Sequence, residues 1–434
     1  MPAQTTTQSE TTEATPEQTT AGEEEIEFVD YAAQVKLDMD SDTAKEEVTV
    51  KIFVDGDTTH FYVPSSVMPS GVLKARYLAI NTPESTGKIE PYGKKASTFT
   101  KEKLSAATSI IVESETSAWD PDSTGDRYLS WVWYKTADME DYRNLNIEIL
   151  QNGLAIANNS AGNRYGDTCV AAINQAKALK LNVHSGEKDP DFYYGEAIEV
   201  TLKELRSNID SYNGLKVAFN GVVTMNDNNS VYVEAYDAET DMYFGMPVYY
   251  GFNLGGPGLD ILKIGNEVRI VGSVQYYEAG GTYQVSDLNY RMMKPDDPGN
   301  IQKISEGNEP AFVLTDAERF TTGTVEIQQE EGTVTADYAA MALGTTLEMK
   351  DLKVKSIYTT TNEDSASKGA MTLTCEVDGI TISVRTVVLL DENNNLITSD
   401  AYLGKTIDVK GIVDYYNGTY QIKVFSANNI IIKN

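Results

Sequence analysis

The sequence predicts a mainly β protein with a few helices, and three observations support this. Short β-branched runs such as residues 47–54 recur along the chain, separated by turns rich in glycine, asparagine and aspartate. Helical periodicity gathers in one stretch, residues 92–181. A repeated strand-turn-strand pattern fills the C-terminal half. Because 434 residues exceed one typical core, several domains are expected.

The chain divides into four segments by composition and charge. Residues 1–45 are rich in Thr, Gln, Glu and Ser and hold 11 acids against 2 bases, which predicts a disordered acidic tether. Residues 46–186 hold 17 acids and 14 bases and are nearly balanced, although the whole chain carries a net charge of −30. A polar linker then leads to two further domains, over residues 187–298 and 299–434. A polyanion is therefore expected to approach residues 46–186 most readily.

The tether also suggests where the protein works. A low-complexity stalk directly after Met1 is common in exported surface proteins, lipoproteins especially. The chain is therefore expected to be extracellular or held at the cell surface, with its export signal removed. No apolar run approaches the roughly eighteen residues of a membrane helix, so no membrane span is expected. The protein is expected to be a monomer.

Residues 46–186 have the element order of a small barrel. The alternating and β-branched runs predict strands, and the amphipathic stretches predict helices packed outside them. This order fits a closed barrel of the OB-fold type. The predicted strands are residues 47–54, 60–63, 73–80, 109–113 and 128–133, and the helices are residues 92–106, 145–153 and 168–181.

One stretch of this segment gathers groups suited to phosphodiester chemistry. Residues 76–84 (RYLAINTPE) follow an Asp55-Gly56-Asp57 turn, and Asp126-Arg127 lies further along. Hard cations prefer carboxylate and carbonyl oxygens, and guanidinium groups hold phosphate. Taken singly, each piece has an ordinary interpretation: a hairpin turn, a helix start and a surface ion pair. Only their joint occurrence favours catalysis.

Five blocks of sequence resemble the staphylococcal nuclease (thermonuclease) domain in order and spacing. They are residues 54–58, 76–84, 92–100, 146–155 and 176–183, and the resemblance covers about 140 residues. It implies a calcium-dependent phosphodiesterase, a hydrolase that cleaves DNA, RNA or both.

The resemblance also implies roles for individual residues. Asp57, Asn81 and the carbonyl of Thr82 would bind Ca²⁺, and Asp55 would support their loop. Glu84 would be the general base on the attacking water. Arg76 and Arg127 would hold the phosphate and stabilise the charge of the transition state.

Two departures from the family pattern leave a second hypothesis open. Asn81 stands where the family usually has aspartate, which removes one formal charge from the metal site. The family's substrate-stacking tyrosine is replaced in residues 158–161 (NNSA), so base stacking is weaker or falls to Tyr165. The alternative is therefore a cell-surface binding or scaffold protein with an inactive nuclease-like domain.

The C-terminal half contains an internal repeat. Residues 264–277 match residues 403–416, and each copy continues through a turn into Gly-Thr-Tyr-Gln. The pattern predicts two OB-like barrels, with residues 310–340 either opening the second copy or forming a connector. Their tyrosines could stack on a single strand, but the surrounding charge is acidic, so protein or glycan contacts, or half-buried sheet positions, are equally open.

Overall fold

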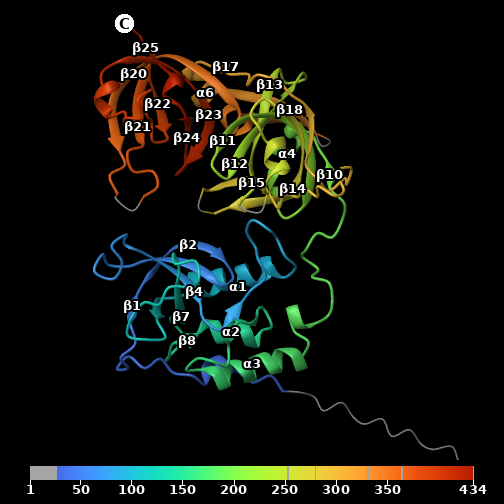
Figure 1. The fold of residues 1–434 in the computed structure, drawn as a ribbon, viewed down its shortest axis with the longest axis vertical. Coiled ribbons are helices and arrows are strands. Elements are labelled where there is room, and N and C mark those ends of the chain that lie inside the picture. Colours follow the sequence, from blue (N-terminus) through green and yellow to red (C-terminus); the bar gives the residue numbers. More distant parts are fainter. Residues whose placement is uncertain (1–26, 252–253, 279, 330–331, 363–364, 434) are drawn as a thin grey trace, which may run out of the picture.

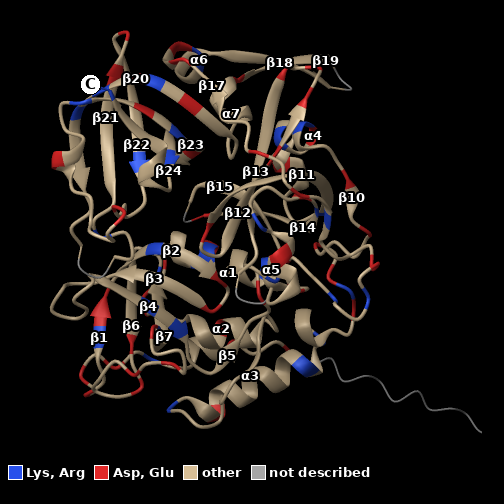
Figure 2. Ribbon diagram, turned by 45° about the horizontal axis from the view of Figure 1, so that its top comes forward, with Lys and Arg blue, Asp and Glu red and all other residues tan. Residues whose placement is uncertain are grey.

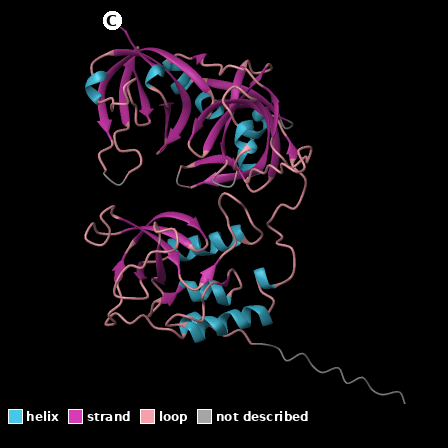
Figure 3. Cartoon of the chain, in the orientation of Figure 1, coloured by secondary structure: helices cyan, strands magenta, loops and turns pink. Residues whose placement is uncertain are grey.

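A computed structural model describes residues 27–251, 254–278, 280–329, 332–362 and 365–433. The described chain is mainly β, with three seven-stranded sheets and two small two-stranded ones. Its N-terminal segment lies on one side, and two barrels lie next to each other on the other side (Figure 1). The longer helices belong to the N-terminal segment, while the barrels carry only short ones (Figure 3). The predicted fold class is confirmed at this level.

The N-terminal segment (residues 27–185) is built on one sheet and three α-helices. The predicted strand over residues 73–80 is shorter than expected, because β4 ends at Tyr77 and Ala79 turns with a φ of 69°. Its strands are β1 (Lys45–Glu47), β2 (Thr49–Asp55), β3 (Thr58–Tyr62), β4 (Val72–Tyr77), β5 (Ile80–Asn81), β6 (Ser109–Glu113), β7 (Tyr128–Lys135), β8 (Arg143–Asn144) and β9 (Ile156–Ala157), and its helices are η1 (Tyr31–Ala33), α1 (Gly93–Ser105), α2 (Leu145–Gln151), α3 (Gly166–Ala178) and η2 (Asn182–His184).

The sheet of this segment curls into a barrel. Its strands run in the order β1-β6-β7-β4-β3-β2. Only Val48 separates β1 from β2 in the chain, so the two ends of this path are joined. The Val48 N–H continues the β1–β6 ladder by donating to the carbonyl of Ile110 at 2.9 Å. Trp131 and Trp133 on β7 are fully buried in the core. Helix α2 packs on β7, and the ring of Tyr165, directly before α3, packs on both tryptophans.

The predicted tether of residues 1–45 is corrected in its second half. Residues 1–26 lie outside the described residues, but residues 29–33 pack on α2 and α3, and Lys45 already belongs to the sheet as the start of β1. The Val29 N–H donates to Gln175 Oε1 at 2.7 Å, and Asp30 forms a two-point ion pair with Arg143 at 2.8 Å. Ala32 is completely buried. The tether was predicted from the average composition of residues 1–45, which is dominated by the first 26 residues. The few residues that anchor the chain are apolar or ion-paired and change this average little.

The first barrel spans residues 198–305. Its path β11-β12-β13-β15-β14 closes through pairing of β11 with β14, and β10 and β16 extend it. Its elements are β10 (Ile198–Glu199), α4 (Leu202–Ser207), η3 (Ile209–Tyr212), β11 (Lys216–Asp227), β12 (Ser230–Asp237), β13 (Met242–Tyr249), α5 (Pro257–Ile261), β14 (Glu267–Tyr277), β15 (Thr282–Ser286) and β16 (Gln302–Ser305).

The second barrel spans residues 313–433 and repeats this order strand for strand. Its path β20-β21-β22-β24-β23 closes through pairing of β20 with β23, with β17 and β25 in the places of β10 and β16. Its elements are β17 (Val313–Leu314), α6 (Ala317–Thr322), β18 (Thr324–Gln329), β19 (Gly332–Asp337), α7 (Tyr338–Met341), β20 (Thr346–Thr359), β21 (Met371–Val377), β22 (Ile380–Thr386), η4 (Ser399–Ala401), β23 (Thr406–Tyr416), β24 (Thr419–Val424), η5 (Ala427–Asn429) and β25 (Ile430–Lys433).

The structure moves the boundary that was predicted between residues 298 and 299. Strand β16 pairs with β14, so the first barrel continues to Ser305. The open question over residues 310–340 is also answered: β17 and α6 match β10 and α4 and begin the second copy, while β18 and β19 form an inserted hairpin. The predicted boundary followed a proline-rich turn that lies inside the first barrel.

The two barrels share one hydrophobic core and are joined by buried polar contacts. Glu234 of the first barrel accepts hydrogen bonds from the N–H of Thr346, at 2.7 Å, and from its hydroxyl. The buried guanidinium of Arg206 donates to the carbonyls of Gly245 and Leu343. The N-terminal segment has a separate core.

Candidate active site

The turn between β2 and β3 buries two carboxylates. Asp57 is 1% exposed and Asp55 is 7% exposed. The Asp57 N–H donates to Asp55 Oδ1 at 3.1 Å, which fixes the turn. Gly56 is required by close packing, since a Cβ there would lie 2.9 Å from both Ala96 of α1 and Thr82. Burial raises the pKa of Asp55, and the charge of Arg76 opposes this rise.

Strand pairing places Arg76 beside this turn. Arg76 lies opposite Thr58 in the β3–β4 pair, one residue after Asp57. Its guanidinium forms an ion pair with Asp57 Oδ1 and donates to Asn81 Oδ1 at 2.5 Å. Two of the predicted metal ligands therefore converge on one guanidinium. Burial lowers the pKa of Arg76, and Asp55 opposes this effect.

The oxygen atoms at this place fit a hard cation in kind. Asp57 Oδ2 accepts the N–H of Thr82 at 2.8 Å, so Asp57, Asn81 and Thr82 adjoin one another. The Thr82 hydroxyl is buried without a hydrogen-bond partner among the described residues. Carboxylate, amide and carbonyl oxygens are the donors that Ca²⁺ prefers. Within the described part of the chain, no group of three or more His, Cys, Asp or Glu residues is placed to hold a metal ion. At this place Asn81 supplies an amide oxygen and not a carboxylate.

Glu84 follows Pro83 at the rim of the site and is solvent-exposed. Its carbonyl accepts the N–H of Glu90 at 2.9 Å. A Cβ on Gly93 would lie 2.2 Å from the same carbonyl, so the start of α1 packs directly on the backbone of Glu84. Partial burial raises the pKa of Glu84, Asp55 adds to this rise, and Arg76 and Arg127 oppose it.

Arg127 comes from a different loop and reaches the same end of the barrel. It precedes β7, whose Tyr128 and Leu129 pair in parallel with Ala75 and Arg76 of β4. Asp122 Oδ2 accepts from Arg127 Nε at 2.8 Å, and Asp122 Oδ1 accepts from the N–H and hydroxyl of Thr124. The acidic loop therefore folds as a turn that positions Arg127.

The structure thus brings the predicted residues together. Arg127 lies near enough to influence the ionisation of Arg76, Asp55 and Glu84, and Arg76 influences the other carboxylates in turn. Two guanidinium groups, two buried carboxylates and one exposed carboxylate share one end of the barrel. This arrangement can bind a phosphate and present a base beside it.

Tyr165 does not take the place of the missing aromatic residue. Its ring packs edge-on against Trp131, 5.0 Å between ring centroids, and Trp133, at 5.7 Å. Residues 158–161 instead bind the turn after β4, where the Ser160 hydroxyl and the Asn158 N–H both donate to the carbonyl of Ala79. No base-stacking ring stands at this position.

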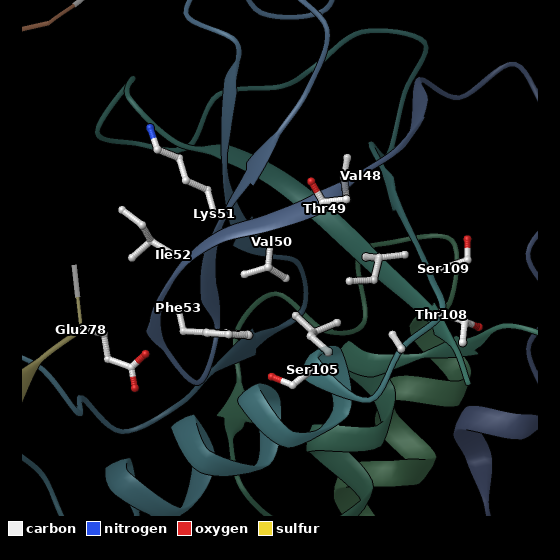
Figure 4. Close-up of a pocket in the computed structure, with 13 residues that line it drawn as sticks. Val48, Thr49, Val50, Lys51, Ile52, Phe53, Ser105, Thr108, Ser109 and Glu278 are labelled. Atoms are coloured by element: carbon white, nitrogen blue, oxygen red, sulfur yellow. The ribbon is translucent and has the colours of Figure 1, made fainter. Parts of the chain in front are cut away.

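Besides a hollow of about 460 Å³ along α1, two larger hollows lie near the barrel of the N-terminal segment. One, of about 620 Å³, lies between β2 and the end of α1 and is lined mainly by uncharged side chains (Figure 4). The other, of about 710 Å³, lies between the N-terminal segment and the first barrel and contains Arg127 in its wall. Sequence reasoning missed this cleft. The repeated tyrosines of the barrels were noticed, but the sequence does not tell which of them faces the site.

Lysine and arginine positions are interspersed with acidic ones in both parts of the molecule (Figure 2). No helix of the described residues is long and apolar enough to cross a membrane. In comparisons with known proteins, residues 74–185 match the family model described as staphylococcal nuclease homologue. The match begins within β4 and includes Arg76, Asn81, Glu84 and Arg127. No curated protein matches the chain.

Proposed function

From the staphylococcal nuclease homologue domain that the chain contains, we propose that this protein is an exported, calcium-dependent nuclease acting on DNA, RNA or both. The observation that carries the proposal is the grouping of Arg76, Arg127 and Glu84 at one end of the barrel. Residues 46–186 are nearly balanced in charge within an acidic chain, so a polyanion can approach the protein most readily there.

Each residue has a role that follows from its chemistry. The planar guanidinium groups of Arg76 and Arg127 bind the phosphate oxygens and stabilise the negative charge that grows there in the transition state. Glu84, solvent-exposed at the rim, accepts a proton from the attacking water. Asp55 orders the turn that carries Asp57, through the backbone hydrogen bond of Asp57.

Asp57, Asn81 and the carbonyl of Thr82 are the residues that would hold Ca²⁺. When bound, the ion supplies positive charge next to the phosphate. Arg76 contacts Asp57 and Asn81 in this structure, so its guanidinium has to turn from these oxygens toward a phosphate. The amide of Asn81 makes the site less anionic than one built with a second carboxylate, and Ca²⁺ binding is correspondingly weaker.

The alternative, a binding or scaffold protein with an inactive domain, also has an observation in its favour. Asn81 is engaged by Arg76, and residues 158–161 carry no aromatic ring. Against it stands the retention of the base and both arginines together.

Degradation of single-stranded DNA by the full chain tests the proposal. We expect cleavage with Ca²⁺ and none with chelator, and we expect Glu84→Gln to remove it. Glu102→Gln is the matched control, because Glu102 is exposed on α1 and carries no proposed catalytic role. Equal cleavage by wild type and Glu84→Gln, or no cleavage by the wild type, would refute the nuclease proposal.

A further inference from the structure

The cleft between the N-terminal segment and the first barrel joins the nuclease site to the barrel surface. Its volume of about 710 Å³ falls within the roughly 300–1,000 Å³ of sites that hold small-molecule-sized groups. Arg127 and Thr58 line one side, and Tyr249, Tyr276 and Tyr277 of the first barrel line the other. A ligand bound at Arg127 can therefore extend within the same cleft to these three tyrosines, which form its aromatic wall.

The charge of this cleft differs from that of the whole chain. Among the described residues that line it, Lys94, Lys101 and Arg127 are cationic and Glu278 is the one carboxylate, which gives a net charge of +2. The ion pair of Arg127 with Asp122, just outside the lining, reduces this to +1. Burial, together with Lys74 and Lys51, lowers the pKa of His60, which leaves this lining histidine neutral near pH 7. In a protein with a net charge of −30, this lining favours an anionic occupant.

The aromatic wall is available to a ligand. Tyr277 is 47% exposed and Tyr276 is 42% exposed. Tyr276 packs on Tyr283 in an edge-type arrangement with the ring centroids 5.1 Å apart, so part of its ring is already in contact. Tyr277 and Tyr249 lie close enough for the charge of one to raise the pKa of the other, and Tyr249 approaches Gly87. Gly280 of the adjoining turn lies against one edge of the Tyr277 ring, and the rest of this more exposed ring is available to a flat ligand.

Hydrogen bonds and an ion pair connect the two sides of the cleft and fix their relative position. Gln275 Nε2 donates to the carbonyl of Ser85 at 2.5 Å, and the Gly87 N–H donates to Gln275 Oε1 at 3.4 Å. Lys101 of α1 forms an ion pair with Glu278. These contacts fix the loop directly after Glu84 to the strand that carries Tyr276 and Tyr277. The aromatic wall consequently has a defined position relative to the proposed base.

We infer that the first barrel completes the substrate site: single-stranded nucleic acid lies in this cleft, with an unpaired base stacked on Tyr277 and its phosphates toward Lys94 and Arg127. The inference rests on the proposed nuclease function for the position of the scissile phosphate. It supplies from the barrel the aromatic contact that residues 158–161 lack. Stacking requires an unpaired base, so the cleft selects single strands over duplex.

Fluorescence anisotropy of a labelled, cleavage-resistant phosphorothioate 12-mer on the full chain tests the site directly. We expect Tyr277→Ala to weaken binding of the single strand about tenfold, and Tyr277→Phe to stay within about twofold of wild type, because the ring is kept. Tyr416→Ala is the matched control, at the equivalent position of the second barrel, and should leave binding unchanged. Binding of the same sequence as duplex should not depend on Tyr277.

Cleavage kinetics separate this inference from the nuclease proposal. On single-stranded DNA we expect Tyr277→Ala to raise KM with kcat little changed. If Tyr277→Ala changes neither the affinity for the single strand nor the KM of cleavage, the inference is overturned and the nuclease proposal stands. Tyr277-dependent binding without any cleavage by wild type would uphold the cleft and refute the nuclease. Equal losses in Tyr277→Ala and Tyr416→Ala would also overturn the inference.

Discussion

The first and second barrels share one strand order but differ in what their matching positions contact. Gln275 in the first barrel bonds to the loop after Glu84, whereas the matching Asp414 in the second accepts from Gln421 of its own barrel at 2.7 Å. Glu278, which pairs with Lys101, is matched by Asn417. The two barrels have the same strand order and similar buried residues. At matching surface positions they have different residues, which suit the different neighbours of each barrel.

The comparison teaches that the aromatic pair alone does not define a binding site. Tyr276-Tyr277 and Tyr415-Tyr416 occupy the same strand positions, and each first tyrosine packs on a cross-strand partner. Only the first pair lines a cleft that also contains Arg127. The function of the pair therefore depends on the adjoining N-terminal segment, and the following predictions test this difference.

The largest effect is expected from the N-terminal segment itself. Glu84→Gln should lower kcat for single-stranded DNA by about 10²- to 10⁴-fold, because the proton acceptor is lost while the arginines that bind phosphate remain. Steady-state kinetics at saturating Ca²⁺ measure this change. A variant of either barrel that lowered kcat as much as Glu84→Gln would contradict the division of roles.

A smaller effect is expected where the first barrel holds the catalytic loop. Gln275→Ala removes two hydrogen bonds to the backbone of Ser85 and Gly87, so Glu84 is less well positioned and kcat should fall about fivefold. Asp414→Ala in the second barrel is the matched control and should leave kcat unchanged. If both variants behave alike, the contact to the loop has no functional role.

A weaker, salt-dependent effect is expected from the ion pair between Lys101 and Glu278. Both side chains are well exposed, so their contribution to docking is at most about 1 kcal/mol and declines with added salt. Glu278→Gln should loosen this docking slightly at low salt and not at high salt, seen as faster amide hydrogen exchange in the loop after Glu84. An effect that persists in high salt would show that Glu278 acts through something other than this pair.

The smallest expected effect is a difference in how the stability of the two parts of the molecule depends on pH. Both histidines lie in the N-terminal segment, and burial lowers the pKa of His60 and His184. Protonation then favours the unfolded state, so this segment should lose at most about 1 kcal/mol as pH falls from 7 through the ordinary histidine pKa near 6.5. In the barrels, burial raises the pKa of Glu234, which has the opposite sign: its protonation favours folding.

Tryptophan fluorescence reports this difference, because all three tryptophans lie in the N-terminal segment, while far-UV circular dichroism also follows the barrels. Because Asp55 and Glu84 of the N-terminal segment also have a raised pKa, which acts in the opposite sense, the effect of the histidine is measured as a difference between variants. Thermal unfolding between pH 7 and pH 5 should shift the fluorescence transition downward more in the wild type than in His60→Gln. Equal shifts in the two proteins would contradict this prediction.

Much of this architecture could be predicted from sequence because local patterns carry it. Alternation and β-branching located the strands, and the repeat of residues 264–277 in 403–416 predicted two similar barrels. The proximity of Arg76, Asn81 and Glu84 could be predicted because all three lie on one strand and in the turn directly after it. These features depend on contacts between residues that lie near each other in the chain or in a repeated unit.

The remaining features depend on contacts between distant segments. Nothing local distinguishes Tyr277 from Tyr416, since the difference lies in the packing of the first barrel on the loop after Glu84. The anchoring of residues 29–33 needs the side chains of Gln175 and Arg143, which lie more than a hundred residues away. The contact of Arg76 with Asn81 likewise follows from the turn at Ala79, which the sequence did not indicate.

The most direct measurement is photocross-linking of a single-stranded oligonucleotide containing 5-bromouracil to the full Glu84→Gln chain, followed by peptide mapping. The account predicts cross-links to the peptide that contains Tyr276 and Tyr277, with loss of these cross-links in Tyr277→Ala. Cross-links confined to the second barrel, or equal labelling of the peptides around Tyr277 and Tyr416, would contradict it.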